Sequence, residues 1–173
     1  MLYLLIILLV AIDQLTKYLI VQNVDINQAI TVIKGFFEIT HVENTGGAFS
    51  FLSDTSWGIF VLSSISGVIA VILVSLIFRL RKSEFKFIRF ILSILAAGTI
   101  GNLIDRVRIG KVIDFLMFTF GKYTFPIFNV ADICVVISSI VLVIMLIFDK
   151  KILDSLSKDN SPEKEIIERN DGE

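Results

Sequence analysis

The sequence predicts an all-α membrane protein, built as a four-transmembrane-helix bundle with a small β-segment on the outer surface of the membrane. Two observations indicate this fold class. Of the 173 residues, 55% are hydrophobic, and the mean hydropathy of +0.83 lies well above the average of soluble globular proteins. Four segments also approach the roughly 20 apolar residues that cross a bilayer. They lie at about 1–22, 56–78, 87–104 and 128–148.

The first segment resembles a secretory signal peptide in one respect, because Met1 to Ile12 is an apolar run. However, no basic region precedes this run and no Ala-x-Ala cleavage site follows it. The apolar pattern resumes from Leu15 to Val21. We therefore expect this segment to be a retained transmembrane helix.

The link between the second and third segments sets the expected orientation, because it carries five basic residues against one acidic residue, Glu84. By the positive-inside rule, this link lies in the cytoplasm. Four spans then place both termini in the cytoplasm and residues 23–55 and 105–127 on the outer side. The basic residues are Arg79, Arg81, Lys82, Lys86 and Arg89.

Between the spans, the segment at about 30–43 is rich in Thr, Val, Ile and Phe and ends at a turn-forming Asn44-Thr45-Gly46-Gly47, which predicts short β-structure. We expect this segment to rest on the outer membrane surface. Residues 1–149 then form one membrane domain. Residues 150–173 mix both charges and lack apolar content, so we expect a flexible cytoplasmic tail.

Small residues four apart allow helix backbones to approach closely in lipid. Two such pairs occur, Ala97 with Gly101 and Ser63 with Gly67. We interpret both as ordinary packing contacts within the bundle.

Ionisable groups at membrane depth are costly, at about 2.5–3.5 kcal/mol each on insertion scales, and therefore indicate functional sites. Asp13 and Lys17 are four residues apart on one helix and can form an ion pair. A purely structural ion pair would explain both residues without a functional site. Asn102, Asp105 and Arg106 also share a helix face. Solvation of the helix end is the alternative explanation for Asp105 and Arg106.

Asn129 and Asp132 fall in the first turn of the fourth helix, where an asparagine can act as a simple N-cap. Capping by Asn129 leaves Asp132 unexplained. Asp132 lies one turn inside the outer boundary, and Asp114 lies in the loop that joins the third and fourth helices. Most of the polar groups therefore converge in the outer third of the bilayer.

Two carboxylates brought close together share one proton, so that one can activate water while the other polarises a carbonyl. This is the chemistry of aspartic proteases. Asp114 and Asp132 are the best-placed pair. Asp105 lies next to Arg106, which we expect to hold it ionised.

Five blocks of residues along the chain, taken in order, resemble one known family. The resemblance is to the bacterial lipoprotein signal peptidase family, also called signal peptidase II. Gly47 stands where that family more often has alanine, and Thr99 replaces a commoner small apolar residue; neither position carries a catalytic group. The blocks are Asp13-Gln14-Leu15-Thr16-Lys17, Asn44-Thr45-Gly46-Gly47-Ala48-Phe49, Gly101-Asn102-Leu103-Ile104-Asp105-Arg106, Val112-Ile113-Asp114-Phe115 and Phe128-Asn129-Val130-Ala131-Asp132.

The resemblance implies an intramembrane aspartic endopeptidase with Asp114 and Asp132 as the catalytic pair. It implies that the substrate is a diacylglyceryl-modified prolipoprotein, cut just before the lipidated cysteine by direct attack of water. No cofactor, metal or acyl-enzyme is expected. The remaining matched residues would bind substrate or support the site; they are Asp13, Lys17, Asn44, Asn102, Asp105, Arg106 and Asn129.

The partners and location follow from the same resemblance. We expect lipid-modified prolipoproteins and membrane lipids as partners, a monomer as the working form, and the bacterial plasma membrane as the location, with the active site near its outer face. The net charge of −1 offers no basic surface to nucleic acid, so no nucleic-acid partner is expected.

Three other functions are compatible with parts of the sequence. An ion or proton transporter would use intramembrane aspartates, but the inner half offers no comparable group below Asp13. A cysteine protease would need Cys134 and the single histidine, His41, yet Cys134 lies about 200° around the helix from Asp132. A non-catalytic assembly subunit gives no reason for Asp and Asn residues at one depth.

Overall fold

The computed structural model describes residues 2–46, 57–80 and 85–148. The chain divides into two units, Met1–Ser139 and Ile140–Glu173, and the first unit contains every helix and strand except the second half of the last helix. The predicted tail at 150–173 lies outside the described residues. The elements in chain order are α1 (Leu2–Asn23), β1 (Ala29–Ile33), β2 (Phe37–Asn44), α2 (Gly58–Arg79), α3 (Lys86–Ile109), β3 (Val112–Phe120), β4 (Tyr123–Thr124) and α4 (Val130–Phe148).

The four helices are of the membrane-spanning type, each 19 to 24 residues long and apolar throughout a long window. Their exposed side chains are large and apolar, such as Leu4 at 67% exposure and Phe60 at 74%. Ionisable side chains such as Asp13 and Lys17 are buried instead. This inside-out distribution suits a lipid surrounding, so the chain is a membrane protein.

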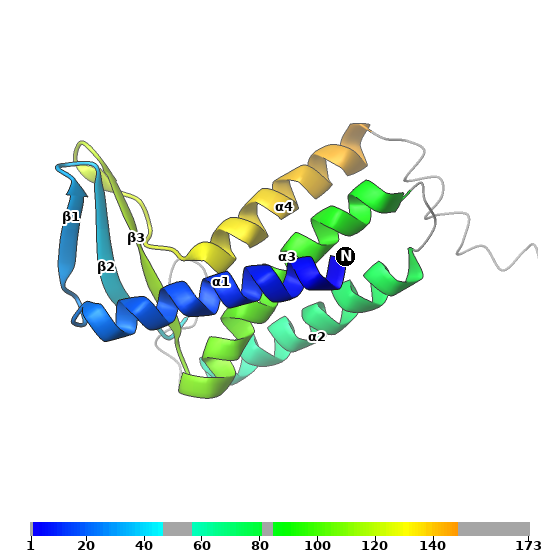
Figure 1. The fold of residues 1–173 in the computed structure, drawn as a ribbon, viewed down its shortest axis with the longest axis horizontal. Helices are drawn as coiled ribbons and strands as arrows, with labels where there is room; N and C mark the ends of the chain where they lie inside the picture. The colour runs from blue at the N-terminus through cyan, green and yellow to red at the C-terminus, as the bar shows by residue number, and fades with distance from the viewer. Residues whose placement is uncertain (1, 47–56, 81–84, 149–173) are drawn as a thin grey trace, which may run out of the picture. The chain divides into compact units, whose positions relative to one another are not determined.

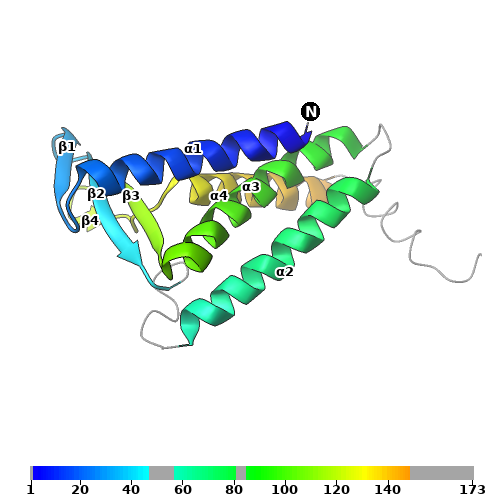
Figure 2. The same cartoon turned by 60° about the horizontal axis from the view of Figure 1, so that its bottom comes forward.

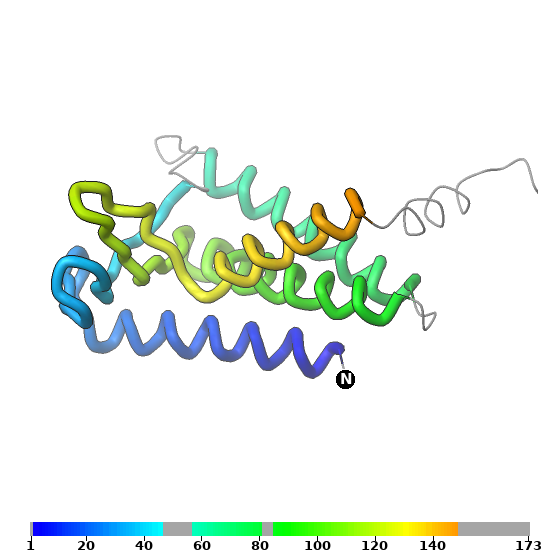
Figure 3. The backbone as a smooth tube through the Cα atoms, turned by 90° about the horizontal axis from the view of Figure 1, so that it is seen from above, coloured from blue at the N-terminus to red at the C-terminus, as the bar shows by residue number. Residues whose placement is uncertain are grey.

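Within the first unit, α3 packs against both α1 and α2 (Figures 1 and 3). Gly101 of α3 allows a close approach, because a Cβ there would lie 2.6 Å from Asp13 Oδ2 and 3.2 Å from Ala131 Cβ. Around Gly67 of α2, by contrast, no described atom lies within 4 Å of a Cβ position. The expected close contact is therefore present at Gly101 and absent at Gly67 among the described residues.

The strands form one antiparallel sheet in the order β1-β2-β3-β4, next to the C-terminal end of α1 (Figure 2). The predicted β-segment at about 30–43 is the β1–β2 hairpin. The sheet is larger than predicted, because residues 112–120, which we expected to be part of a loop, form its longest strand. Apart from Asp114, the first seven residues of this strand are apolar, and Val112 to Phe115 are all buried. A strand covered on both faces needs no alternation.

A β-bulge in β2 changes which side chains face the site. Ile39 pairs with Leu116, but the next paired residues are Val42 and Asp114, so β2 carries one more residue than β3 over this stretch. Such an insertion bends a strand and re-aims the side chains beyond it. Asn44, two residues after the bulge, consequently donates to Asp114 across the strands.

A small apolar core holds the sheet against α1. Ile20 near the end of α1 and Val24 directly after the helix are buried against Ile113 and Phe115 of β3. This core brackets Asp114 on β3, so the position of that carboxylate is fixed by packing on both sides.

Candidate active site

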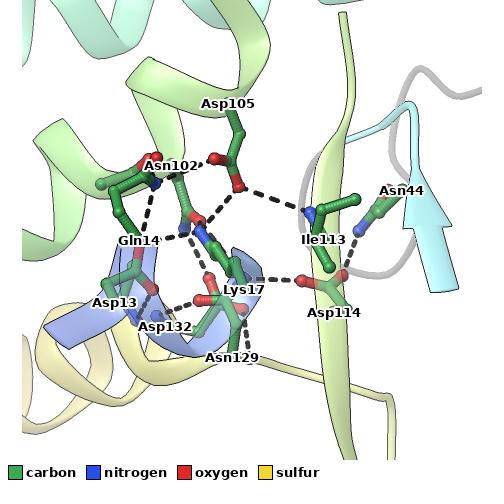
Figure 4. A network of polar contacts seen from close by, with 12 residues as sticks. Asp13, Gln14, Lys17, Asn44, Asn102, Asp105, Ile113, Asp114, Asn129 and Asp132 are labelled. Atoms are coloured by element: carbon green, nitrogen blue, oxygen red, sulfur yellow. Dashed lines mark hydrogen bonds and ion pairs between the residues drawn. The ribbon is translucent and has the colours of Figure 1, made fainter. Parts of the chain in front are cut away.

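The polar residues singled out in the sequence come from five separate segments and meet in one network (Figure 4). Among the described residues, hydrogen bonds and ion pairs connect eight of the nine. The network includes Asp13 and Lys17 from α1, Asn44 from β2, Asn102 and Asp105 from α3, Asp114 from β3, Asn129, and Asp132 from α4. Arg106, the ninth, lies beside this network.

The two predicted catalytic carboxylates, Asp114 and Asp132, line the same cavity. Asp114 accepts two hydrogen bonds: Oδ1 accepts one of 2.6 Å from Asn129 Nδ2, and Oδ2 accepts one of 3.0 Å from Asn44 Nδ2. Asp132 also accepts two: Oδ1 accepts a hydrogen bond of 2.7 Å from Asn102 Nδ2, and Oδ2 accepts one of 3.1 Å from the Asn129 backbone N–H. Each carboxylate is thus oriented by two donors, and three of the four come from asparagine amides.

Asn129 is at once a helix cap and a link between the two carboxylates. Its Oδ1 accepts the Asp132 backbone N–H at 2.9 Å while its own backbone N–H donates to Asp132, the reciprocal pattern of a capping box. Its Nδ2 donates to Asp114 Oδ1 and, at 3.2 Å, to Asn102 Oδ1. The fully buried side chain of Asn129 therefore caps α4 and also contacts both carboxylate-bearing segments of the site.

Behind the two carboxylates lies a buried ion triad centred on Lys17. Its Nζ lies 2.9 Å from Asp13 Oδ2 and 2.8 Å from Asp105 Oδ2, and all three side chains are at most 2% exposed. The expected pairing of Asp13 with Lys17 is present. We expected Arg106, the next residue in the sequence, to hold Asp105 ionised. Asp105 instead forms its ion pair with Lys17.

Arg106 is instead directed to the cavity. The helix α3 continues to Ile109, so Arg106 lies inside its last turns and not at its end. The guanidinium Nε is buried and has no hydrogen-bond partner within the part of the chain that the structure describes. Arg106 therefore retains hydrogen-bonding capacity beside the two carboxylates.

The cavity has a volume of about 240 Å³. Asparagines, aspartates and Arg106 line its polar side, and the segment before α4, together with residues of α4 one turn beyond Asp132, supplies apolar walls. An amide bond could lie against the polar side while neighbouring side chains contact the apolar side. The lining residues are Asn44, Asn102, Arg106, Val112, Asp114, Phe125, Pro126, Ile127, Phe128, Asp132, Val135 and Val136.

The surroundings of Asp114 raise the pKa of its carboxyl group. Burial raises the pKa of Asp114 from its ordinary value of 3.8 to about 6, and the neighbouring charge of Asp132 adds to this rise. Hydrogen bonds from Asn44 and Asn129 oppose it. Near neutral pH, the Asp114 carboxyl can therefore change its protonation state.

Sequence reasoning missed one side chain and two backbone groups of this network. Gln14 Nε2 donates a hydrogen bond of 2.9 Å to Asp105 Oδ1, which stabilises the charge of that carboxylate. The backbone N–H groups of Ile113 and Ala131 donate to Asp105 and Asp13. Gln14 could have been found as a polar residue within an apolar helix, but no sequence pattern identifies the two backbone donors.

The alternative catalytic and metal sites find no support among residues 2–46, 57–80 and 85–148. His41 Nδ1 bonds the Val24 carbonyl oxygen at 2.8 Å, whereas Cys134 packs where α4 meets Gly98 of α3. In that part of the chain, no group of three His, Cys, Asp or Glu side chains is placed to hold a metal ion. Asp114 and Asp132 are the acidic side chains there that line the cavity.

Sequence comparison finds one family. The family described as signal peptidase (SPase) II matches residues 5–148. Lipoprotein signal peptidases from Enterococcus faecalis and Desulforapulum autotrophicum are 43% and 39% identical to this chain, each over 83% of it and over 86% and 89% of their own lengths. The corresponding protein from Bacillus pumilus is 36% identical over 86% of this chain and 94% of its own.

Structural comparison agrees. Two solved structures, both described as bacterial membrane enzymes, superpose with TM-scores of 0.75 and 0.74 at 34% and 35% identity. Each alignment covers 86% of this chain, and 88% and 94% of the respective solved chain. The arrangement of four apolar helices with a small sheet is therefore similar to that of known membrane enzymes.

Proposed function

Since this chain belongs to the signal peptidase II family, whose peptidases process lipoproteins, we propose that it is an intramembrane aspartic endopeptidase with Asp114 and Asp132 as its catalytic pair. Its substrates are diacylglyceryl-modified prolipoproteins, and it cuts just before the lipidated cysteine. One observation carries this proposal. Asp114 and Asp132 line one cavity, with both oxygens of each oriented by amide donors.

The pair holds one proton between its two carboxyl groups in the proposed mechanism. The ionised group takes a proton from a bound water as the water oxygen attacks the carbonyl carbon, and the protonated group donates a hydrogen bond to the carbonyl oxygen. The tetrahedral intermediate then collapses as a proton passes to the amide nitrogen, which leaves as the new amino terminus. The raised pKa of Asp114 supports a shared proton near neutral pH.

The volume of the cavity supports a division of the substrate between protein and lipid. At about 240 Å³, the cavity is below the 300–1,000 Å³ range of typical ligand pockets. It suits the few peptide groups around the scissile bond. The acyl chains would remain in the bilayer beside the exposed apolar side chains of the helices, such as Val136 on α4.

The site would lie near the outer face of the bacterial plasma membrane, with both termini in the cytoplasm. The five basic residues of the link between α2 and α3 support this orientation through the positive-inside rule. The sheet would then rest on the outer surface and cradle the substrate from above. Unchanged cleavage after replacing residues 30–42 with a flexible linker would contradict that role of the sheet.

The substrate and cut position are tested by incubating the purified full-length chain in detergent with prolipoprotein that carries, or lacks, the diacylglyceryl group. Mass spectrometry of the products identifies the new N-terminus. We expect cleavage of the lipidated form alone, leaving the lipidated cysteine first. Equal cleavage of both forms, or a cut elsewhere, would contradict the proposed substrate class.

A further inference from the structure

The side chain of Lys17 uses its whole hydrogen-bonding capacity inside the protein. An ammonium group has three N–H donors and no acceptor. The three acceptors within 2.9 Å of Lys17 Nζ are Asp13 Oδ2, Asp105 Oδ2 and Asn102 Oδ1. The three contacts converge on one buried atom, and no N–H remains for substrate or water.

Each of these three contacts leads toward one of the two catalytic aspartates (Figure 4). Asp13 Oδ1 accepts the backbone N–H of Ala131 at 2.9 Å, and Ala131 directly precedes Asp132. Asp105 Oδ2 accepts the backbone N–H of Ile113 at 3.4 Å, and Ile113 directly precedes Asp114. The contact at Ile113 is long for a hydrogen bond and therefore weak, so the connection to Asp132 is the firmer of the two.

The third contact determines how the Asn102 amide faces the site. Because Lys17 only donates, it requires an oxygen, and Asn102 therefore turns Oδ1 toward Lys17 and Nδ2 toward Asp132 Oδ1 at 2.7 Å. Asn129 Nδ2 donates to the same Asn102 oxygen at 3.2 Å, so Lys17 and Asn129 hold this orientation of the amide together. Lys17 thereby helps to fix a donor on the catalytic pair without contacting the pair itself.

We propose that Lys17 is a positioning residue that sets the separation and orientation of Asp114 and Asp132, through Asn102 and through the backbone N–H groups before each aspartate. This inference rests on the proposed catalytic role of the two aspartates. Asp114 lies on β3 and Asp132 on α4. The ion triad of Asp13, Lys17 and Asp105 connects the backbone at both positions to α1 and α3. Lys17 acts on the chemical step, because a displacement of about 1 Å can lower catalytic rate roughly 100-fold.

The triad also bears on stability, so the test must separate the two effects. Lys17→Met alone leaves two buried carboxylates without their cation, which is strongly destabilising. The double variant Lys17→Met/Asp105→Asn removes one of the two carboxylate charges as well, which lowers that cost and leaves only Asp13 without its cation. A third variant, Lys17→Arg, keeps the charge but replaces three converging N–H groups with a planar guanidinium.

The experiment measures thermal unfolding, kcat and KM for the full-length variants in detergent, on lipidated prolipoprotein. Lys122→Met, which removes an exposed lysine in the turn between β3 and β4, is the matched control. For the double variant and Lys17→Arg, we expect a folded protein, KM within about threefold of native, and kcat lower by roughly 100-fold. Lys122→Met should match the native chain in all three quantities.

Three results would overturn the proposal. The first is a kcat within about twofold of native in either folded Lys17 variant, and the second is a loss confined to KM. The third is failure of both variants to fold, which would make the triad a folding element alone. Asp114→Asn in the same series distinguishes the two proposals: if it is inactive while the Lys17 variants are fully active, only the positioning role fails.

Discussion

The carboxyl group of Asp114 couples the chemistry of the site to pH. Its pKa is about 6 in the folded chain against an ordinary value of 3.8. Between these two values the folded state holds more protons than the unfolded state, so the free energy of unfolding falls as pH rises. The stabilisation from this group is complete below about pH 4 and is lost above about pH 6, with a magnitude on the order of 3 kcal/mol.

We therefore expect Asp114→Asn to show a smaller loss of stability than the native chain when pH rises from about 4 to 7. The reason is that the amide cannot ionise in its buried position. Thermal unfolding in detergent across this pH range measures the effect. Parallel curves for the two proteins would contradict the raised pKa.

At the residue level, the sequence predicted which side chains meet but not how they bond. The pairing of Asp13 with Lys17 followed from helical spacing, which is a local property. The pairing of Lys17 with Asp105 joins residues 88 positions apart, and depends on how α1 and α3 pack. For the same reason, Asn129 was identifiable as a cap, whereas its bond to Asp114 was not.

Among the helices, α3 depends on the absence of a side chain at Gly101. An added Cβ would lie 2.6 Å from Asp13 Oδ2, so Gly101→Ala should displace Asp13 and the start of α4. We expect a loss of stability of about 1–3 kcal/mol, typical of overpacking, together with reduced cleavage. Thermal unfolding and the cleavage assay measure the two effects.

Gly67→Ala is the matched control for this substitution, because no described atom lies within 4 Å of its Cβ position. Alanine favours a helix over glycine by about 1 kcal/mol, so this variant should be as stable as the native chain or more so. Equal destabilisation at both positions would contradict the close approach at Gly101.

The strands show where prediction from local patterns fails. The β1–β2 hairpin was predicted because β-branched and aromatic residues precede a turn signal. The strand β3 lies in the segment that we expected to be a loop between two helices. Its four consecutive buried residues show no alternation that would have indicated a strand. The bulge between Ile39 and Val42 arises from pairing with β3, so β2 alone could not reveal it.

For the molecule as a whole, the orientation in the membrane is the main prediction that remains to be tested. With Cys134 replaced by serine, a single cysteine at Lys122 would report on the sheet, and one at Ser155 would report on the tail. The label is a membrane-impermeant maleimide, applied to cells whose outer layers have been removed and whose plasma membrane is intact. We expect it to label Lys122→Cys in these cells, and Ser155→Cys only after the plasma membrane is permeabilised. The reverse pattern would contradict the orientation.

The fold class was predictable at this scale because bilayer thickness and hydropathy constrain helix number and length. Four apolar helices were expected and are present, with ends differing by a few residues, most at α3, which continues to Ile109. The size of the sheet was not predictable, because it depends on pairing between strands about 70 residues apart.

The most direct test of the central claim is a comparison of the native chain with Asp114→Asn and Asp132→Asn on lipidated prolipoprotein in detergent. Each variant removes one ionisable group from the pair and keeps the size of the side chain. We expect cleavage by the native chain alone, while both variants remain folded as judged by thermal unfolding. Cleavage at the native rate by both folded variants would contradict the aspartic mechanism.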